Sequence, residues 1–239
     1  MFIENFFTEK DSRILISKQQ ASDFAKQIAD DFNPIHDPDS KYFCVPGDLL
    51  FSLILDKYGL SQQMTFTFSG MVGDNIPLHF PPTSKDSGKD EFSITDDNEK
   101  HYLRVEHQGN VSINKEMISE FTKNYVAFSG TNFPDVIVPL MEEHNVMINP
   151  DRPLVIYDSM SIDLDTIDIQ HPTLEPIGTS LKVQGKKAIA LLEFAVKSDG
   201  ETIGKGLKKL ALRGLRDFDQ EKVENMVNYY KERKITLAP

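Results

Sequence analysis

The chain has 239 residues, enough for one large domain or two small ones, and 39% of them are hydrophobic, so we expect a packed core. The formal net charge of −11 disfavours binding to nucleic acids. No apolar run is long enough to cross a bilayer, and the N-terminal residues lack the basic start of a secretory signal. Because Cys44 is the only cysteine, no internal disulfide is possible, and we expect a cytoplasmic protein.

The first predicted element is a helix over about 18–30. Apolar residues recur at three- and four-residue spacing from Ala21 to Ile28, as on one face of a helix. Ser17 and Gln20 form a capping-box pattern at its start. Pro34 restricts the residue before it to extended geometry, so the helix ends in a short polar loop.

A second helix is predicted over 48–58, with Gly59 as its C-cap. The pattern then changes to strands. Residues 64–70 alternate between apolar and polar side chains, which is typical of a half-buried strand. Residues 91–95 and 101–107 flank a polar turn and predict a hairpin.

The same order of elements then recurs. INKEMISEFTK at 113–123 is similar to ISKQQASDFAK at 16–26. It is followed by a helix to 128, a polar loop at 129–135, a helix over 136–145, strands at 160–164 and 178–183, and a hairpin of 187–197 with 201–214. This duplication predicts two tandem units, 1–109 and 110–217, with a C-terminal helix and tail at 218–239.

A long helix followed by antiparallel strands buries its apolar face on the concave side of the sheet. This is the hotdog arrangement. The predicted fold class is therefore α+β: a double hotdog of two tandem units, each a long helix wrapped by an antiparallel sheet, plus a C-terminal helix. Two sheets that join edge to edge hide their edge strands. Both a monomer and a homodimer are compatible with this fold.

The loop after the first helix carries the most specific pattern. Asp31 and His36 lie five residues apart in the sequence, and Pro34 stiffens the turn between them. The amide of Asn33 can bond nearby backbone and hold the shape of the loop. A carboxylate and an imidazole placed in this way can share a water and move protons.

The segment FAKQIADDFNPIH resembles the FAxxxGDxNPxH signature of the MaoC-like dehydratases and (R)-specific enoyl-CoA hydratases, and VGDNIPL is similar to a strand of that family. The resemblance implies addition of water to an enoyl thioester, or its removal from the 3-hydroxyacyl thioester. Asp31 would polarise the water, and His36 would share it and move the second proton. Asn33 and Pro34 would shape the loop, and Gly47 would provide a backbone donor for the thioester carbonyl.

The implied partner is an acyl-CoA or acyl carrier protein thioester, with coenzyme A or phosphopantetheine only as part of the substrate. Two departures from the family favour a first alternative, a non-catalytic hotdog protein that binds an acyl thioester or another hydrophobic ligand. Asp30 replaces a glycine, and the stretch after the motif, FCVPGDLL, lacks a histidine of the family. A second alternative is an acyl-thioester hydrolase. The corresponding loop of the second unit, 130–135, lacks the Asp–His pair, so we expect this unit to form the other wall of an acyl tunnel.

One basic stretch has two interpretations. It is either a solvated strand face or a seat for the phosphates of coenzyme A or for an acidic carrier protein, formed by Lys205, Lys208, Lys209 and Arg213. The remaining histidines do not cluster in the sequence, and we predict no metal site.

Overall fold

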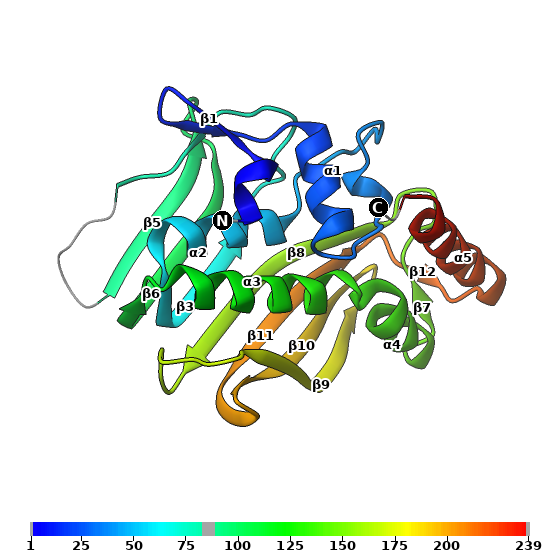
Figure 1. Cartoon of the computed structure of the whole chain (residues 1–239). Helices are drawn as coiled ribbons and strands as arrows, with labels where there is room; N and C mark the ends of the chain where they lie inside the picture. Colours follow the sequence, from blue (N-terminus) through cyan, green and yellow to red (C-terminus); the bar gives the residue numbers. More distant parts are fainter. Residues whose placement is uncertain (1, 83–88, 238–239) are drawn as a thin grey trace.

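The computed structural model describes residues 2–82 and 89–237, and its centre is a ten-stranded antiparallel sheet (Figure 1). In spatial order the strands are β1 (Thr8–Lys10), β2 (Arg13–Leu15), β4 (Leu78–His79), β5 (Lys89–Asp96), β6 (His101–Ser112), β3 (Leu60–Phe68), β8 (Leu154–Leu164), β11 (Glu201–Arg213), β10 (Lys187–Ser198) and β9 (Thr173–Gln184). The first six belong to the first half of the chain. Strand β6 crosses the boundary that the sequence predicts between residues 109 and 110.

The two halves meet where β3 pairs with β8. Met64 lies opposite Ile162, and Phe66 lies opposite Met160. All four side chains are buried. The inner edges of the two half-sheets are therefore paired with each other, and the hydrophobic core continues across the junction.

Two helices, α2 (Gly47–Tyr58) and α3 (Lys115–Gly130), pack against this sheet and against each other (Figure 1). Residues 48–55 of α2 are all buried, as expected of a core helix that is apolar on nearly all sides. The rings of Phe51 in α2 and Tyr125 in α3 have centroids 4.5 Å apart. The chain is an α+β double hotdog, as predicted.

The two halves differ in which helix is the long one. In the first half, α1 (Lys18–Gln27) is shorter than α2, which occupies the core. In the second half, the long core helix α3 comes first and is followed by the short α4 (Val138–Glu143). In both halves, two helices are followed by antiparallel strands. The apolar character of α2 decides which helix of the first half is buried in the centre.

Helix α1 begins as predicted and ends earlier. Ser17 is the N-cap, and it exchanges capping-box hydrogen bonds with Gln20. The last helical residue is Gln27, three residues before the predicted end. Asp30 has a φ of 53°, so the chain leaves the helical conformation before the polar loop begins.

The prediction of a loop over 129–135 is wrong. Helix α3 continues through Gly130, and a π-helix, η3 (Phe133–Ile137), leads directly into α4. Pro134 lies in the first turn of η3, where the missing N–H of proline leaves no hydrogen bond unmade. The polar residues of this segment therefore lie in helical backbone.

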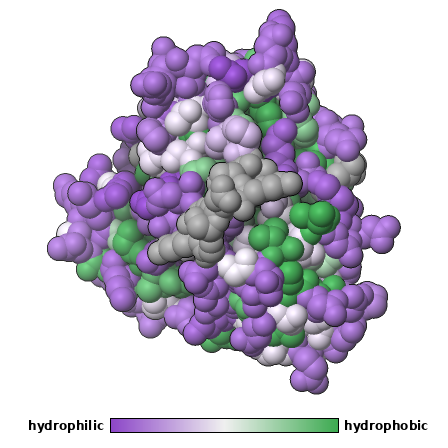
Figure 2. All heavy atoms as spheres, turned by 90° about the vertical axis from the view of Figure 1, so that its left-hand side faces the viewer, coloured by the Kyte–Doolittle hydropathy of each residue, from purple (hydrophilic) through white to green (hydrophobic). Residues whose placement is uncertain are grey.

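The C-terminal residues form a separate layer at one end of the sheet (Figure 1). Strands β7 (Val146–Met147) and β12 (Arg216–Asp217) form a small second sheet, and α5 (Gln220–Leu237) follows. A 3₁₀-helix, η1 (Phe2–Phe6), begins the described chain. Hydrophilic side chains cover most of the face in Figure 2. Among the described residues, no helix is long and apolar enough to span a membrane.

Candidate functional site

The loop between α1 and α2 brings Asp31 and His36 side by side. The carboxylate Oδ2 of Asp31 and the imidazole Nε2 of His36 are 3.6 Å apart. The side chain of Asp31 is 20% exposed and that of His36 is 10% exposed. A water that lies beside two atoms at this separation can bond to both of them. The structure therefore brings together the pair that the sequence predicts.

The other ring nitrogen of His36 is fixed by the backbone. Its Nδ1 lies 2.8 Å from the carbonyl oxygen of Cys44. Because a carbonyl only accepts hydrogen bonds, this nitrogen carries a proton. Burial lowers the pKa of His36, but the hydrogen bond to Cys44 and the charge of Asp31 outweigh it and raise the pKa from 6.5 to about 9. At neutral pH the ring is therefore an imidazolium whose Nε2–H faces Asp31.

Asn33 and Pro34 form the turn between Asp31 and His36. The Oδ1 of Asn33 accepts a hydrogen bond from the N–H of Ile35 at 3.1 Å. It caps the 3₁₀-helix η2 (Pro34–His36), which Pro34 begins. The N–H of Asn33 in turn donates to Oδ1 of Asp31 at 2.8 Å. One carboxylate oxygen of Asp31 is thus held by the backbone, and the other is directed to His36.

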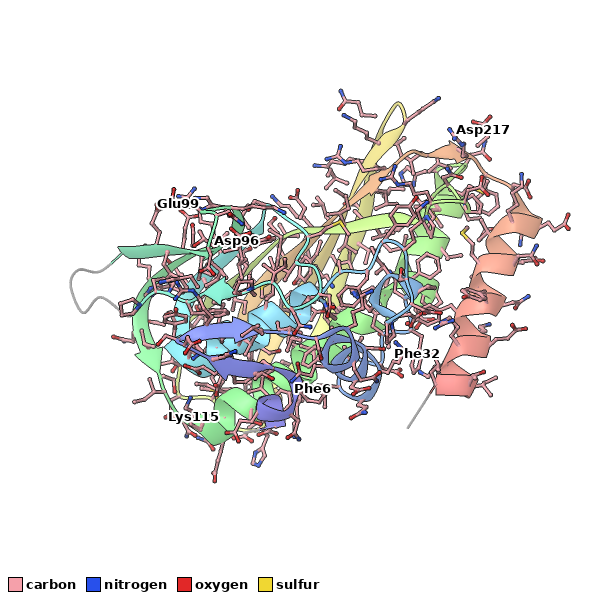
Figure 3. All side chains as sticks on the ribbon, turned by 90° about the horizontal axis from the view of Figure 1, so that it is seen from above. Phe6, Phe32, Asp96, Glu99, Lys115 and Asp217 are labelled. Carbon is pink, nitrogen blue, oxygen red and sulfur yellow. The ribbon has the colours of Figure 1, made fainter. Side chains whose placement is uncertain are left out.

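Helix α5 holds this loop from outside. The hydroxyl of Tyr230 accepts a hydrogen bond from the N–H of Phe32 at 3.2 Å, and it lies 3.3 Å from the carbonyl oxygens of Asp30 and Gly130. The rings of Phe32 and Tyr230 pack edge to face, 6.2 Å apart, and Figure 3 shows Phe32 between α1 and α5. Lys234 forms an ion pair with Asp30, the carboxylate that stands where the MaoC-like signature has glycine.

Gly47, predicted to shape the site, is the first residue of α2. A Cβ at this position would lie 2.7 Å from Cδ1 of Tyr157 and 3.2 Å from Cε1 of Phe68, so glycine permits a close approach of these rings. The first N–H groups of a helix have no acceptor inside the helix. The amides of Gly47 and Asp48 are therefore placed to bind a partly negative oxygen.

Asp31, Asn33, His36 and Gly47 line one cavity of about 380 Å³. Small-molecule sites span roughly 300–1,000 Å³. Both halves of the chain form the wall, and the second half contributes residues of α3, η3, β8 and β11. The apolar part of the wall includes Leu50, Phe68, Val72, Phe133, Ile137, Val155 and Leu210. The second half is thus a wall of the cavity that the Asp31–His36 loop faces.

The cavity also contains a buried polar cluster, Asp48, Ser129 and Lys208, which the sequence analysis did not identify. The hydroxyl of Ser129 donates to Oδ2 of Asp48 at 2.5 Å, and Nζ of Lys208 donates to Ser129 Oγ. Burial raises the pKa of Asp48, against the opposing charge of Lys208. Burial likewise lowers the pKa of Lys208, against the opposing charge of Asp48.

Two periodic patterns in the sequence could have revealed this cluster. Ser129 follows Tyr125 by one helical repeat, so it shares the buried face of α3. Lys208 alternates along β11 with the buried residues Gly206 and Leu210. For Asp48, the signal is a charged residue within an otherwise apolar helix that is buried.

The four basic residues of β11 do not form one surface. Lys208 is 4% exposed and faces the cavity. Lys205 and Arg213 are exposed and Lys209 is partly exposed, on the opposite face of the strand. Because successive strand residues point to opposite faces, Lys208 cannot join a surface seat for phosphates. A surface site for phosphates or an acidic carrier protein, formed by Lys205, Lys209 and Arg213, stays a prediction.

Other candidate groups do not add to this site. In the part of the chain that the structure describes, no group of three or more His, Cys, Asp or Glu side chains could hold a metal. Cys44 is partly buried, and its thiol lies 3.4 Å from the carbonyl oxygen of Val45. Its contribution to the site is the carbonyl oxygen that fixes His36.

Among solved structures, the chain is similar to a conserved protein of unknown function with hot dog fold from Alicyclobacillus acidocaldarius. The identity is 7% and the TM-score 0.48, over 89% of this chain and 98% of that one. It is similar to acyl-CoA thioesterase II TesB2 from Mycobacterium marinum, with 9% identity and a TM-score of 0.47, over 92% and 99% of the two chains. A MaoC-like dehydratase has 11% identity and a TM-score of 0.42, over 87% and 98%. Both a thioesterase and a dehydratase occur among these neighbours.

No curated protein sequence matches the chain. The sequence model of one protein family matches residues 1–221. That span includes both half-sheets and the loop with Asp31 and His36, and it ends within the first turn of α5. The chain therefore belongs to the family described as "Protein of unknown function (DUF3581)".

Proposed function

We propose that the chain is a MaoC-like (R)-specific hydratase or dehydratase, which adds water to an enoyl thioester or removes it from a 3-hydroxyacyl thioester. One observation carries the proposal: Oδ2 of Asp31 and Nε2 of His36 lie 3.6 Å apart on the wall of a cavity of about 380 Å³. Coenzyme A or phosphopantetheine would enter only as the thiol part of the substrate.

In this arrangement Asp31 acts as the base and His36 as the acid. As the water oxygen bonds to the β-carbon, Asp31 Oδ2 takes one proton of the water, and the electrons of the double bond move towards the thioester carbonyl. The imidazolium of His36 then delivers its Nε2 proton to the α-carbon. Transfer of the first proton from Asp31 to His36 restores both groups. Dehydration runs through the same steps in reverse.

The thioester carbonyl needs a donor while negative charge collects on its oxygen. The N–H of Gly47, at the positive end of α2, supplies this donor in the proposed complex. The close packing of Gly47 against Tyr157 and Phe68 supports this role because it fixes the helix end at the cavity wall.

The chain departs from the MaoC-like signature at two places, and contacts in the structure offset one of these departures. The additional carboxylate of Asp30 is paired with Lys234 and does not line the cavity. It therefore adds no unpaired negative charge beside Asp31. Pro46, where the family has a histidine, is the N-cap of α2 and leaves the start of the helix intact.

The test is the loss of enoyl absorbance when purified protein is added to short and medium trans-2-enoyl-CoAs. The wild type is expected to hydrate them. Asp31→Asn and His36→Ala are expected to lower kcat/KM at least about 100-fold, because each removes one proton-transfer group. Asp39→Asn and His101→Ala, an exposed carboxylate and an exposed imidazole outside the cavity, are the matched controls and should retain activity.

Two other outcomes correspond to the alternatives. Release of free thiol from acyl-CoAs would indicate an acyl-thioester hydrolase. Absence of both reactions, with thioesters still raising the Tm, would indicate a non-catalytic hotdog protein that binds an acyl thioester or another hydrophobic ligand. Either outcome would contradict the proposed hydration.

A further inference from the structure

The buried cluster of Asp48, Ser129 and Lys208 has no part in the proposed hydration step. Its members come from the start of α2, the end of α3 and the middle of β11. They are 7%, 4% and 4% exposed, and all three line the cavity that contains Asp31 and His36. Within the described residues, no hydrogen bond or ion pair joins Asp48 to Asp31 or His36, although the charges of Asp31 and His36 act on the pKa of Asp48. The cavity thus contains two polar groups of residues on a partly apolar wall.

The cluster is incomplete by itself. Oδ2 of Asp48 accepts the Ser129 hydroxyl, but Oδ1 is buried and has no hydrogen-bond partner among the described residues. A buried acceptor without a donor is rare in proteins and costs roughly 1–3 kcal/mol. A hydrogen-bond donor that reaches Oδ1 of Asp48 would therefore stabilise the cluster.

Lys208 indicates that the bound molecule should also accept a hydrogen bond. Its Nζ donates to Ser129 Oγ and lies 4.3 Å from the centroid of the Tyr157 ring. An ammonium has three N–H donors, so donor capacity remains beside the unpaired acceptor. A hydroxyl both donates and accepts one hydrogen bond, and it can serve Asp48 and Lys208 together. A carboxylate would be repelled by Asp48, and a methyl group would satisfy neither residue.

The apolar side chains around the cluster indicate what kind of molecule carries this hydroxyl. The cavity of about 380 Å³ is many times larger than one water, and apolar side chains such as Leu50, Phe68 and Leu210 share its wall with the cluster. A hydroxyl on an apolar chain matches both parts of the wall. Replacing such a buried charged group with apolar residues is often neutral or stabilising, so the cluster has a cost that ligand recognition can offset.

We infer that Asp48, Ser129 and Lys208 form a subsite for a hydroxyl on the acyl chain, beyond the carbons where water is added. This inference rests on the proposed function, because it assumes that the cavity takes an acyl thioester. It narrows the substrate class to acyl thioesters that carry a hydroxyl in addition to any at the β-carbon. Ser129 positions Asp48 and Lys208, and those two residues would contact the ligand.

The test measures binding by titration calorimetry, without any turnover. The probes are hexanoyl-CoA, ω-hydroxyhexanoyl-CoA and (ω−1)-hydroxyhexanoyl-CoA, which are saturated and cannot be hydrated. The wild type is expected to bind at least one hydroxylated probe about tenfold or more tightly than hexanoyl-CoA. In the double variant Asp48→Leu/Lys208→Met the ratio of the two Kd values should fall to about one. The double replacement removes both charges together, so it leaves no unpaired buried charge to unfold the protein.

Lys187→Met, which removes an exposed lysine from the neighbouring strand β10, is the control and should keep the preference of the wild type. Equal affinity of the wild type for all three probes would overturn the inference, because a fixed water would then suffice as the partner of Asp48. An unchanged preference in the double variant would overturn it as well. Binding of hexanoyl-CoA with no preference contradicts the subsite alone, whereas failure of every probe to bind contradicts the proposed function too.

Discussion

At the scale of single residues, one backbone contact orients the side chain of Asp31 and another orients that of His36. One oxygen of Asp31 is held by the N–H of Asn33, and one nitrogen of His36 by the carbonyl of Cys44. The two remaining atoms face each other at 3.6 Å. Backbone groups thus orient both side chains, and the reactive atoms stay available to a substrate and a water.

The proton on His36 gives a testable link between pH and stability. The pKa is raised from 6.5 to about 9 in the folded chain, which corresponds to roughly 3 kcal/mol. A raised pKa stabilises the fold fully below about pH 6.5, and this contribution is lost as the pH rises through about 9. The free energy of unfolding, measured with urea at several pH values, should therefore fall across this window. His36→Ala should show a smaller fall, and an identical pH profile in both proteins would contradict the assignment.

Gly130 allows α3 to end directly against the loop. A Cβ there would lie 1.7 Å from the carbonyl oxygen of Ala29 and 3.3 Å from Cβ of Asp31. Because the first obstacle is backbone, Gly130→Ala must displace the helix end or the loop. We expect a destabilisation of about 3 kcal/mol in urea unfolding. Gly73→Ala, whose Cβ would meet nothing closer than 3.7 Å, should change stability by less than about 0.5 kcal/mol, and equal effects of the two would refute this view.

Local sequence patterns could predict some of these residues and not others. Asp31, Asn33, Pro34 and His36 lie in one loop, so their spacing alone places them together. The contact between Lys234 and Asp30 joins residues 204 positions apart, and only the packing of α5 determines it. The cluster of Asp48, Ser129 and Lys208 is likewise assembled by the tertiary fold, although each buried face was visible in its own periodicity.

At the scale of elements, hydrophobic period and turn chemistry predicted most helices and strands. The capping box of α1 and the hairpin of β5 and β6 form as expected, because these signals act between residues close in sequence. The segment after α3 was wrongly expected to be a loop. Its polar residues favour a loop, but burial of Ile137 and contacts of η3 with α4 keep it helical.

Helix α5 should act on the site through Tyr230, although it lies outside the cavity. Tyr230→Phe removes the hydroxyl that accepts from Phe32 N–H and faces the carbonyls of Asp30 and Gly130. We expect a loss of about 1–2 kcal/mol in the free energy of unfolding, because buried backbone groups lose their partner. Hydration should slow as well, with kcat lowered more than KM is raised, since the loop orients the proton-transfer groups.

The neighbouring tyrosine provides the control for this measurement. Tyr229 is 49% exposed, and its hydroxyl accepts a hydrogen bond from Arg233 at the surface. Tyr229→Phe should alter both stability and turnover only slightly. A Tyr230→Phe protein that is as stable and as active as Tyr229→Phe would show that α5 does not support the loop.

At the scale of the whole molecule, both halves of one chain build one cavity. The first half supplies Asp31, His36 and Gly47, and the second supplies Ser129, Tyr157 and Lys208, among others. The continuous sheet through β3 and β8 holds the halves in register. Sequence duplication predicted this architecture, but the exchange of long and short helices between the halves follows from which helix the core can bury.

A cavity completed within one chain needs no second copy. The rate of hydration per chain is therefore expected to stay constant when the protein is diluted from micromolar to nanomolar concentration. Initial rates over that range, combined with the molar mass from light scattering, check this expectation. A rate per chain that falls on dilution, in step with dissociation of an oligomer, would mean that a second copy contributes to the site.

The most direct test of the central claim follows the oxygen of water. A trans-2-enoyl-CoA is incubated with the protein in water enriched in the heavy oxygen isotope, and the products are analysed by chiral chromatography and mass spectrometry. Hydration by Asp31 and His36 predicts one heavy oxygen at the β-carbon of an intact (R)-3-hydroxyacyl-CoA, and Asp31→Asn should form this labelled product at least about 100-fold more slowly. Heavy oxygen in a free carboxylic acid, with coenzyme A released, would contradict hydration and establish hydrolysis of the thioester.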